Sequence, residues 1–295
     1  MAAQQNRRSA IKNMIAGSAA IGAAGMLSSF AKGPDNMAND KLKGNINHSV
    51  CRWCYSDIPL EQLCAASKDM GIKAIDLVGP KDWPVLQQYG LYSAMCNGAE
   101  LNLTDGFNDK NFHAALIKNY SDMIPLVAKN GYKNLICFSG SRRGKDDETG
   151  WNNCAEGLKQ LTGLAEKHNV ILVMELLNSK INHKDYQCDR TAWGVELVNR
   201  VGSENFKLLY DIYHMQIDEG DVIRTITDNH QHITHYHTGG VPGRNEIDQT
   251  QELYYPAIMQ AILATGYTGY VAQEFIPKRE DKLASLKQGI QICDV

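Results

Sequence analysis

Four side chains that could hold a metal ion or move a proton each follow a short apolar run. They are Glu175, Asp211, His237 and Glu274, with separations of 36, 26 and 37 residues. Singly, such a carboxylate can cap a loop or a helix or pair with a Lys or Arg, and such a histidine can be a hydrogen-bonded core residue. Three carboxylates together without a cation would raise one another's pKa values. The set predicts one divalent ion, with Mn²⁺ or Mg²⁺ favoured and Co²⁺ or Zn²⁺ as alternatives.

The segments that precede these four residues belong to a longer pattern. From Asn45 onward, short apolar runs alternate eight times with longer amphipathic segments, as in parallel strands joined by helices. This pattern predicts a single-domain α/β fold, a (β/α)8 TIM barrel over residues 45–295. Functional residues of such barrels lie at the C-terminal strand ends, so the four side chains are expected at one rim. The predicted strands are 46–50, 74–78, 91–96, 134–138, 170–176, 206–211, 232–237 and 269–275.

The amphipathic segments carry helix start and stop signals. Asp109 precedes a long helical segment that Gly131 should stop, and Pro125 within it predicts a kink. Another helix is expected from about Gly150 to Lys167. These signals place a helix after most of the predicted strands.

An open, doubly wound nucleotide-binding sheet is the structural alternative, and the sequence argues against it. Such a sheet would have a glycine-rich loop after its first strand, but residues 48–57 contain no glycine. The segment from Gly140 to Lys145 has three residues between its glycines and lacks the Ser or Thr that must follow the lysine of a phosphate loop.

The N-terminal residues differ from the rest of the chain. Arg7 and Arg8 precede a weakly apolar stretch, and no acidic residue occurs before Asp35. Residues 1–32 are therefore interpreted as a twin-arginine-type signal segment and 33–44 as a linker, which predicts a periplasmic protein. A simple N-terminal helix and an uncleaved anchor are the alternatives. No stable membrane span is expected after removal of the signal.

Composition limits the partners and the redox chemistry. The net charge of -3 argues against a protein that coats nucleic acid, which requires clustered Lys and Arg. The eight cysteines do not form the pattern of a disulfide framework. The pair Cys51 and Cys54 forms a lone CxxC, and without a second CxxC it is interpreted as structural rather than as a zinc ribbon.

Several segments resemble the hydroxypyruvate isomerase group of the xylose-isomerase-like barrel superfamily, which also holds ketose 3-epimerases. They are VMELLNSKINHKDY, LLYDIYHMQ, HYHTGGVPGRNEID, VAQEFIP and the opening HSVCRWCYSDIPLEQLCAASKDMGIKAIDLVGP. The resemblance extends over nearly the whole chain from about Asn45 onward.

The resemblance implies roles for individual residues. Glu175 and Glu274 would be both metal ligands and the catalytic acid/base pair, with Asp211 and His237 as the other two ligands. In the DxxH pattern, His214 would hold substrate oxygens, and the loop residue Arg244 would bind the far end of the substrate. Independently of the resemblance, His48, near the end of the first strand, is predicted either to line the pocket or to be a core histidine.

The expected function is metal-dependent isomerisation of a small α-hydroxy aldehyde or ketone, hydroxypyruvate-like or a sugar, through an enediolate. Ketose 3-epimerases usually carry a further Glu six residues after the acid that ends the fifth strand, where this chain has Ile181. The alternatives are such an epimerase, an abasic-site endonuclease and a non-catalytic sugar-binding barrel. Barrels of this kind commonly form homo-oligomers.

Overall fold

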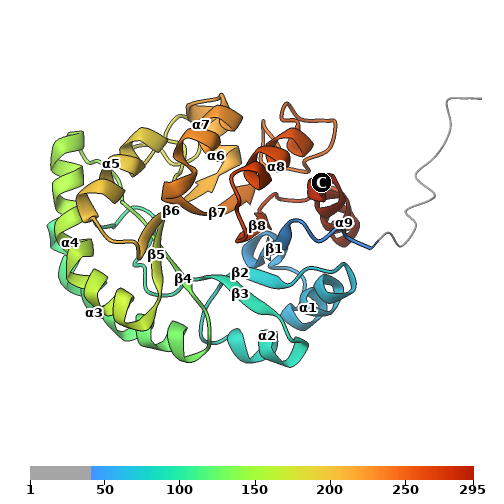
Figure 1. Cartoon of the computed structure of the whole chain (residues 1–295), viewed down its shortest axis with the longest axis horizontal. Helices are drawn as coiled ribbons and strands as arrows, with labels where there is room; N and C mark the ends of the chain where they lie inside the picture. Colours follow the sequence, from blue (N-terminus) through green and yellow to red (C-terminus); the bar gives the residue numbers. More distant parts are fainter. Residues whose placement is uncertain (1–40) are drawn as a thin grey trace, which may run out of the picture. The chain divides into compact units, whose positions relative to one another are not determined.

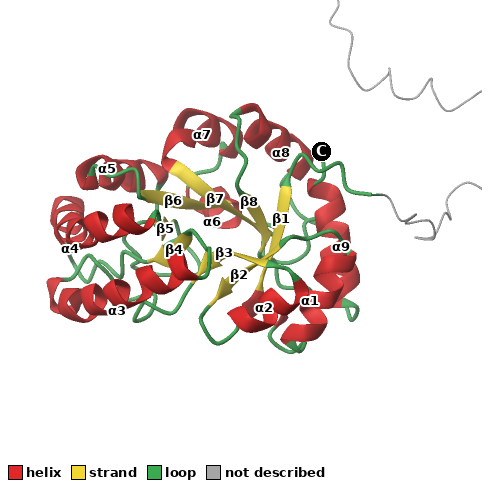
Figure 2. Ribbon diagram, turned by 60° about the horizontal axis from the view of Figure 1, so that its bottom comes forward, coloured by secondary structure: helices red, strands yellow, loops and turns green. Residues whose placement is uncertain are grey.

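The computed structural model describes residues 41–295, in which eight parallel strands close into a barrel in sequence order. The predicted TIM barrel is therefore confirmed. Helices surround the strands (Figures 1 and 2). The strands are β1 (Asn47–Cys51), β2 (Ala74–Val78), β3 (Tyr92–Cys96), β4 (Asn134–Cys137), β5 (Ile171–Glu175), β6 (Phe206–Asp211), β7 (Ile233–Thr238) and β8 (Tyr270–Gln273). The helices are α1 (Leu60–Asp69), α2 (Trp83–Tyr89), α3 (Lys110–Lys129), α4 (Asp147–His168), α5 (Thr191–Val201), α6 (Ile212–Asp218), α7 (Val222–Asn229), α8 (Tyr255–Ala264) and α9 (Lys282–Cys293).

Most strand boundaries and the start of α4 differ from the prediction by one to three residues, and two of these differences bear on local hydrogen bonds. The α4 helix begins at Asp147 rather than near Gly150, since the Asp146 side chain accepts from the Thr149 backbone N–H. Strand β8 ends at Gln273, one residue before Glu274. The Glu274 backbone N–H still donates to the carbonyl of Thr238 in β7, so Glu274 stays at the barrel rim.

Helix α3 follows its sequence signals closely. The Asp109 side chain caps its first turn by accepting from the Asn111 backbone N–H, and the helix continues through Pro125 to Lys129. Gly131 then adopts a φ of 76°, a left-handed conformation that glycine favours.

The closure of the barrel joins the first and last strands. Residues 47–50 of β1 pair with residues 270–273 of β8. Helix α9 lies beside β1 (Figure 1), where the Lys43 backbone N–H donates to Asp294 and the Asn45 amide donates to the Val295 carbonyl. Two residues of the predicted linker, Leu42 and Lys43, thus already contact the barrel.

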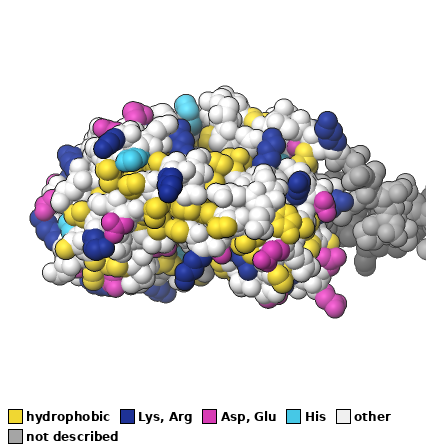
Figure 3. All heavy atoms as spheres, turned by 90° about the horizontal axis from the view of Figure 1, so that it is seen from below, with side chains coloured by type: hydrophobic (Ala, Val, Ile, Leu, Met, Phe, Trp, Pro, Cys, Tyr) yellow, Lys and Arg dark blue, Asp and Glu magenta, His cyan; other side chains and the backbone are white. Residues whose placement is uncertain are grey.

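The proposed signal segment 1–32 lies outside the described residues, so it and the periplasmic location stay predictions. Within residues 41–295, no helix is both long enough and apolar enough to cross a membrane. On the face that Figure 3 shows, Lys and Arg are interspersed with Asp and Glu among hydrophobic and uncharged side chains. All eight cysteines lie in the described part of the chain, where each is free and buried.

Candidate metal centre

Four consecutive strands bring Glu175, Asp211, His237 and Glu274 together. Glu175 and Asp211 are the last residues of β5 and β6, His237 is the penultimate residue of β7, and Glu274 directly follows β8. One ligand atom of each lies within 4.8 Å of those of the others. Their exposed fractions are 4% or less. Sequence spacing and barrel geometry therefore agree on one buried cluster, referred to below as the four-residue cluster.

The electrostatics of the four-residue cluster fit a divalent cation. Burial, and then the charge of Glu274, raise the pKa of Glu175, and burial raises the pKa of Asp211 to about 8. The buried Glu175 Oε1 has no hydrogen-bond partner among the described residues. Carboxylate oxygens and an imidazole nitrogen are suitable ligands for Mn²⁺, Mg²⁺ or Zn²⁺, and a divalent ion would stabilise the ionised acids.

The two glutamates flank His237, and their pKa values are shifted in opposite directions. His237 Nδ1 lies 2.7 Å from Glu274 Oε2 and 3.3 Å from Glu175 Oε1. Burial acts to raise the pKa of Glu274, but Arg244 and His237 hold it well below its usual value. Glu274 is thus ionised at neutral pH, whereas the pKa of Glu175 is raised. Pairs whose surroundings push their pKa values apart are suited to proton transfer.

Arg244 reaches the four-residue cluster from the loop after β7. Its Nη2 donates to Asp211 Oδ2 at 2.9 Å and to Glu274 Oε2 at 2.5 Å. The guanidinium stacks on the rings of Trp53 and Tyr213, at 5.1 and 5.3 Å from their centroids. In this structure its charge is therefore paired with two of the acids.

Hydrogen bonds determine which nitrogen of His214 carries a proton. The backbone N–H groups of Ile181 and Asn182 donate to Asn178 Oδ1, which fixes the orientation of that amide. The Asn178 Nδ2 and backbone N–H then both point at His214 Nδ1, at 2.6 and 3.1 Å. Nδ1 must accept, and burial lowers the pKa of His214 well below its usual value, so the ring is neutral with its proton on Nε2.

The position of His214 Nε2 makes it a donor available to a ligand. It lies 3.6 Å from Asp211 Oδ2, is buried and has no hydrogen-bond partner among the described residues. The Asp211 Oδ1 atom meanwhile caps α6 by accepting from the His214 backbone N–H at 3.1 Å. Asp211 therefore serves both as a helix cap and as a member of the four-residue cluster.

His48 does not reach the four-residue cluster, and of its two readings the structure supports the core histidine. Cys51 Sγ lies 3.8 Å from His237 Nε2 inside the barrel, so strand alternation turns His48 outward toward α9. There His48 Nε2 lies 3.8 Å from Asp294 Oδ1. Burial lowers the pKa of His48 to about 4. Side chains alternate along β1, and the sequence alone did not show which of them point into the barrel. The orientation of His48 could therefore not be predicted.

Four residues near the four-residue cluster were not predicted from the sequence. Trp53, inside the CxxC, donates from Nε1 to Glu274 Oε1 at 2.7 Å. Asp76 and His235 contact each other next to His237, and Asn178 orients His214. An acid in the middle of the apolar run AIDLV and the HxH in HITHYH were the available signals.

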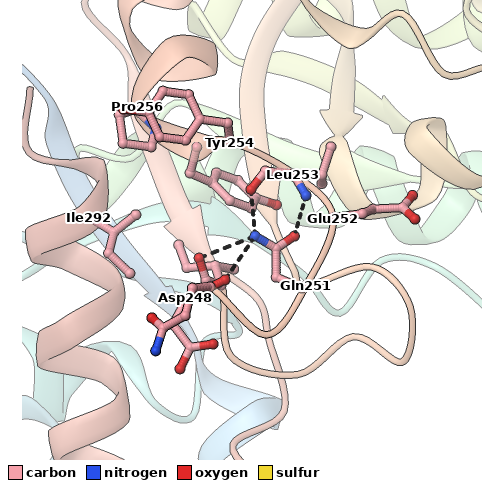
Figure 4. Close-up of a pocket in the computed structure, with 10 residues that line it drawn as sticks. Asp248, Gln251, Glu252, Leu253, Tyr254, Pro256 and Ile292 are labelled. Atoms are coloured by element: carbon pink, nitrogen blue, oxygen red, sulfur yellow. Dashed lines mark hydrogen bonds between the residues drawn. The ribbon is translucent and has the colours of Figure 1, made fainter. Parts of the chain in front are cut away.

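A separate pocket of about 410 Å³ lies between the loop after β7 and α9 (Figure 4). Its lining includes Asp248, Tyr254 and Ile292, and none of the four-residue cluster. The Gln251 side chain donates to the Leu253 carbonyl and accepts from the Leu253 backbone N–H, so its amide stabilises the loop itself.

Several proteins similar to this chain are named as isomerases or epimerases. A putative hydroxypyruvate isomerase of Homo sapiens is 28% identical over 123 residues, which are 42% of this chain and 44% of that protein. The 2-oxo-tetronate isomerase of Pectobacterium atrosepticum is 24% identical over 242 residues, 78% of this chain and 92% of that protein. The D-psicose 3-epimerase of Ruminiclostridium cellulolyticum is 29% identical over 231 residues, 75% and 69% respectively. The match to the human protein spans less than half of its length.

Solved structures share the fold. The AP endonuclease, family 2, from Brucella melitensis has a TM-score of 0.74 at 21% identity, covering 83% of this chain and 99% of that one. The IOLI protein, whose structure holds a zinc atom, has a TM-score of 0.65 at 16% identity, covering 84% and 95%. The model of the xylose isomerase-like TIM barrel family matches residues 60–293. With the closed barrel and the four-residue cluster, this match shows that the chain belongs to the xylose isomerase-like TIM barrel family.

Proposed function

We propose that this protein is a metal-dependent isomerase that interconverts a small α-hydroxy aldehyde and ketone through an enediolate. One observation carries the proposal. Two buried glutamates, Glu175 and Glu274, lie against the same imidazole nitrogen of His237, and their pKa values are shifted in opposite directions. Two acids whose pKa values are shifted apart are suited to serve as base and acid within one site.

The residues of the site divide the work. A divalent ion held by Glu175, Asp211, His237 and Glu274 would polarise the substrate carbonyl and stabilise negative charge on its oxygens. One glutamate would remove the proton α to the carbonyl, the other would return a proton at the former carbonyl carbon, and the proton of the α-hydroxyl would pass to the former carbonyl oxygen. His214 donates from Nε2 to a substrate oxygen. Positioned acid/base groups typically contribute about 10²- to 10⁴-fold in rate.

The substrate class follows from the relatives and from Arg244. Two of the relatives are named for hydroxypyruvate and 2-oxo-tetronate, which are both hydroxylated 2-oxo acids. A guanidinium matches a carboxylate in shape and charge. We therefore propose a small hydroxylated 2-oxo acid or its aldehyde isomer as substrate, with Arg244 binding its carboxylate.

A ketose 3-epimerase is the second candidate, favoured by the relative of that name, which matches 75% of this chain. It would use the same two glutamates and differ in the carbon that loses its proton. Ile181, six residues after Glu175, is 61% exposed and cannot supply the extra carboxylate that the epimerase pattern contains. The isomerase is therefore preferred.

The test is a screen of hydroxy-oxo acids and free ketoses with added Mn²⁺ or Mg²⁺, followed by NMR in D₂O. Aldehyde–ketone conversion with deuterium entering the substrate supports an isomerase. Inversion at carbon 3 of a ketose identifies the epimerase. Binding without exchange of any carbon-bound proton contradicts both and leaves a sugar-binding barrel.

Glu175→Gln and Glu274→Gln test the roles of the two acids, because glutamine keeps an oxygen for the metal but cannot transfer the proton. Each variant should lose at least about 100-fold in kcat. Glu246→Gln is the matched control. Glu246 is a buried glutamate that accepts from Ser285 and the Arg279 backbone N–H, outside the four-residue cluster. Near wild-type turnover in either cluster variant would contradict the two-glutamate mechanism.

A further inference from the structure

A buried polar triad lies inside the barrel on the N-terminal side of the four-residue cluster. Asp76 is the central residue of β2, and His235 and His237 occupy alternate positions in β7, each with 0% exposure. His235 Nε2 lies 2.5 Å from Asp76 Oδ2, and His237 Nε2 lies 3.3 Å from the same oxygen. An ionised carboxylate can only accept hydrogen bonds, so both histidines donate from Nε2.

The two nitrogens of His237 therefore face different partners. Nε2 faces Asp76, whereas Nδ1 faces Glu274 Oε2 at 2.7 Å and Glu175 Oε1 at 3.3 Å. Next to the ionised Glu274, Nδ1 carries a proton as well, so His237 is an imidazolium here. If a divalent ion took the place of the Nδ1 proton, the ring would keep the proton that Nε2 donates to Asp76 and would present the Nδ1 lone pair to the cluster. A histidine that binds a metal usually donates its other N–H to a carboxylate or a carbonyl in this way.

We infer that Asp76 is a positioning residue of the candidate metal centre, which holds the His237 ring so that Nδ1 is the nitrogen presented to a divalent ion. The inference rests on the metal site of the proposed function and on no particular substrate. Asp76 reaches from β2 to β7, which are not neighbours in the barrel, so its contact with His237 crosses the interior. It thereby links the orientation of the ligand to the closed state of the barrel.

An ion pair between Asp76 and His235 alone is the simpler explanation for the buried acid. It accounts for the 2.5 Å contact but not for the second hydrogen bond that the same oxygen receives from His237. A second ion bound by Cys51, Asp76 and His237, whose ligand atoms also lie within 4.8 Å of one another, is the other alternative. Metal affinity and stoichiometry distinguish these three explanations.

The first experiment measures Mn²⁺ binding to the full chain by calorimetry. Asp76→Asn keeps the shape of the side chain but removes its charge, and it should weaken Mn²⁺ binding by about 10- to 100-fold. The matched control is Asp248→Asn, since Asp248 is a 5% exposed aspartate that pairs with Arg279 away from the cluster. Its Mn²⁺ affinity should stay within about twofold of the wild-type value.

Each outcome has a distinct meaning. Equal Mn²⁺ affinity in Asp76→Asn and the wild type overturns the positioning role while leaving the proposed function intact. Uptake of two ions per wild-type chain, with one lost in Asp76→Asn, overturns it in favour of the second ion. A wild-type chain that binds no divalent ion overturns both this inference and the proposed metal-dependent mechanism.

A second experiment needs no folded Asp76 variant. In the Zn²⁺-loaded wild-type protein with ¹⁵N-labelled histidine, the His237 signals are identified by their loss in His237→Gln. A slowly exchanging proton on Nε2 with a metal-bound Nδ1 supports the inference. A proton on Nδ1, with the metal on Nε2, overturns it.

Discussion

Asn178 determines which nitrogen of His214 carries the proton, because two backbone N–H groups fix the orientation of the Asn178 side-chain amide. Asn178→Asp replaces the donor at Nδ2 with an acceptor, so His214 Nδ1 would have to carry a proton and Nε2 would lose its own unless the ring becomes charged. Loss of one hydrogen bond to a buried polar group costs about 1–3 kcal/mol. We expect kcat/KM to fall by about 10- to 100-fold.

Asn182→Asp is the control for that prediction. The Asn182 side chain accepts from Asn178 Nδ2 and from the Tyr213 hydroxyl, and an aspartate can accept both hydrogen bonds. Steady-state kinetics and the ¹⁵N signals of His214 measure the effects. A His214 tautomer that is unchanged in Asn178→Asp would contradict the argument.

Among single residues, those that end a strand with metal-binding chemistry could be predicted, and those that contact them across the barrel could not. The positions of Glu175 and Asp211 follow from the alternation of strand and helix segments and from the lengths of the apolar runs. Asp76 was visible only as an acid in an apolar run, because nothing in a single sequence shows that β2 faces β7 across the interior. For the same reason, the sequence did not show whether His48 points into or out of the barrel.

At the scale of elements, the loops after β3 and β4 depend on a close backbone approach. A Cβ at Gly106 would lie 2.4 Å from the Gly140 backbone nitrogen, and Gly140 itself has a φ of 92°. Gly106→Ala must therefore separate the two loops, and we expect a loss of about 2–4 kcal/mol in the free energy of unfolding.

The matched substitution is Gly163→Ala in α4, where a Cβ would meet nothing within 4 Å. Alanine is the better helix former there, so the free energy of unfolding should rise by about 0.5–1 kcal/mol. Urea unfolding of both variants tests the pair. An equal loss of stability in the two would show that the backbone contact at Gly106 is not the cause.

Element existence was predictable because each strand is an apolar run between turn or cap residues, whereas element ends depend on single hydrogen bonds. The Asp146 cap makes α4 begin about one turn earlier than predicted. Hydrophobic periodicity cannot show whether Asp146 or the adjacent Asp147 caps the helix. At the other end of α4, the C-cap Asn169 adopts a φ of 53°, a left-handed conformation.

For the whole molecule, His48 couples pH to the packing of β1 against the chain end after α9. Burial lowers its pKa to about 4 from 6.5, although Asp294 opposes this shift. Between these values the unfolded chain binds the proton and the folded chain does not. The stability from neutral His48 is thus present above pH 6.5 and is lost as the pH falls toward 4, by about 3 kcal/mol in total.

His48→Leu should flatten the acid limb of the stability curve, since leucine cannot bind the proton. Urea unfolding at intervals from pH 7.5 to 4 measures this difference. Curves for the variant and the wild type that run parallel over the whole range would show that another group governs the acid limb.

The architecture of the whole molecule could be predicted because eight repeated units over about 250 residues fit few other folds. The pairing of its two ends along β1 and β8, with α9 beside them, required the structure. His48 faces Asp294 on the opposite side of β1 from Cys51, which points into the barrel toward His237.

Arg244 donates to Asp211 and Glu274, so a side-chain charge lies against two of the acids of the four-residue cluster. The charge of these two acids would therefore not depend on a bound divalent ion alone for its compensation. We therefore expect a chelator to abolish activity while the barrel stays folded. Adding the divalent ion back should restore activity.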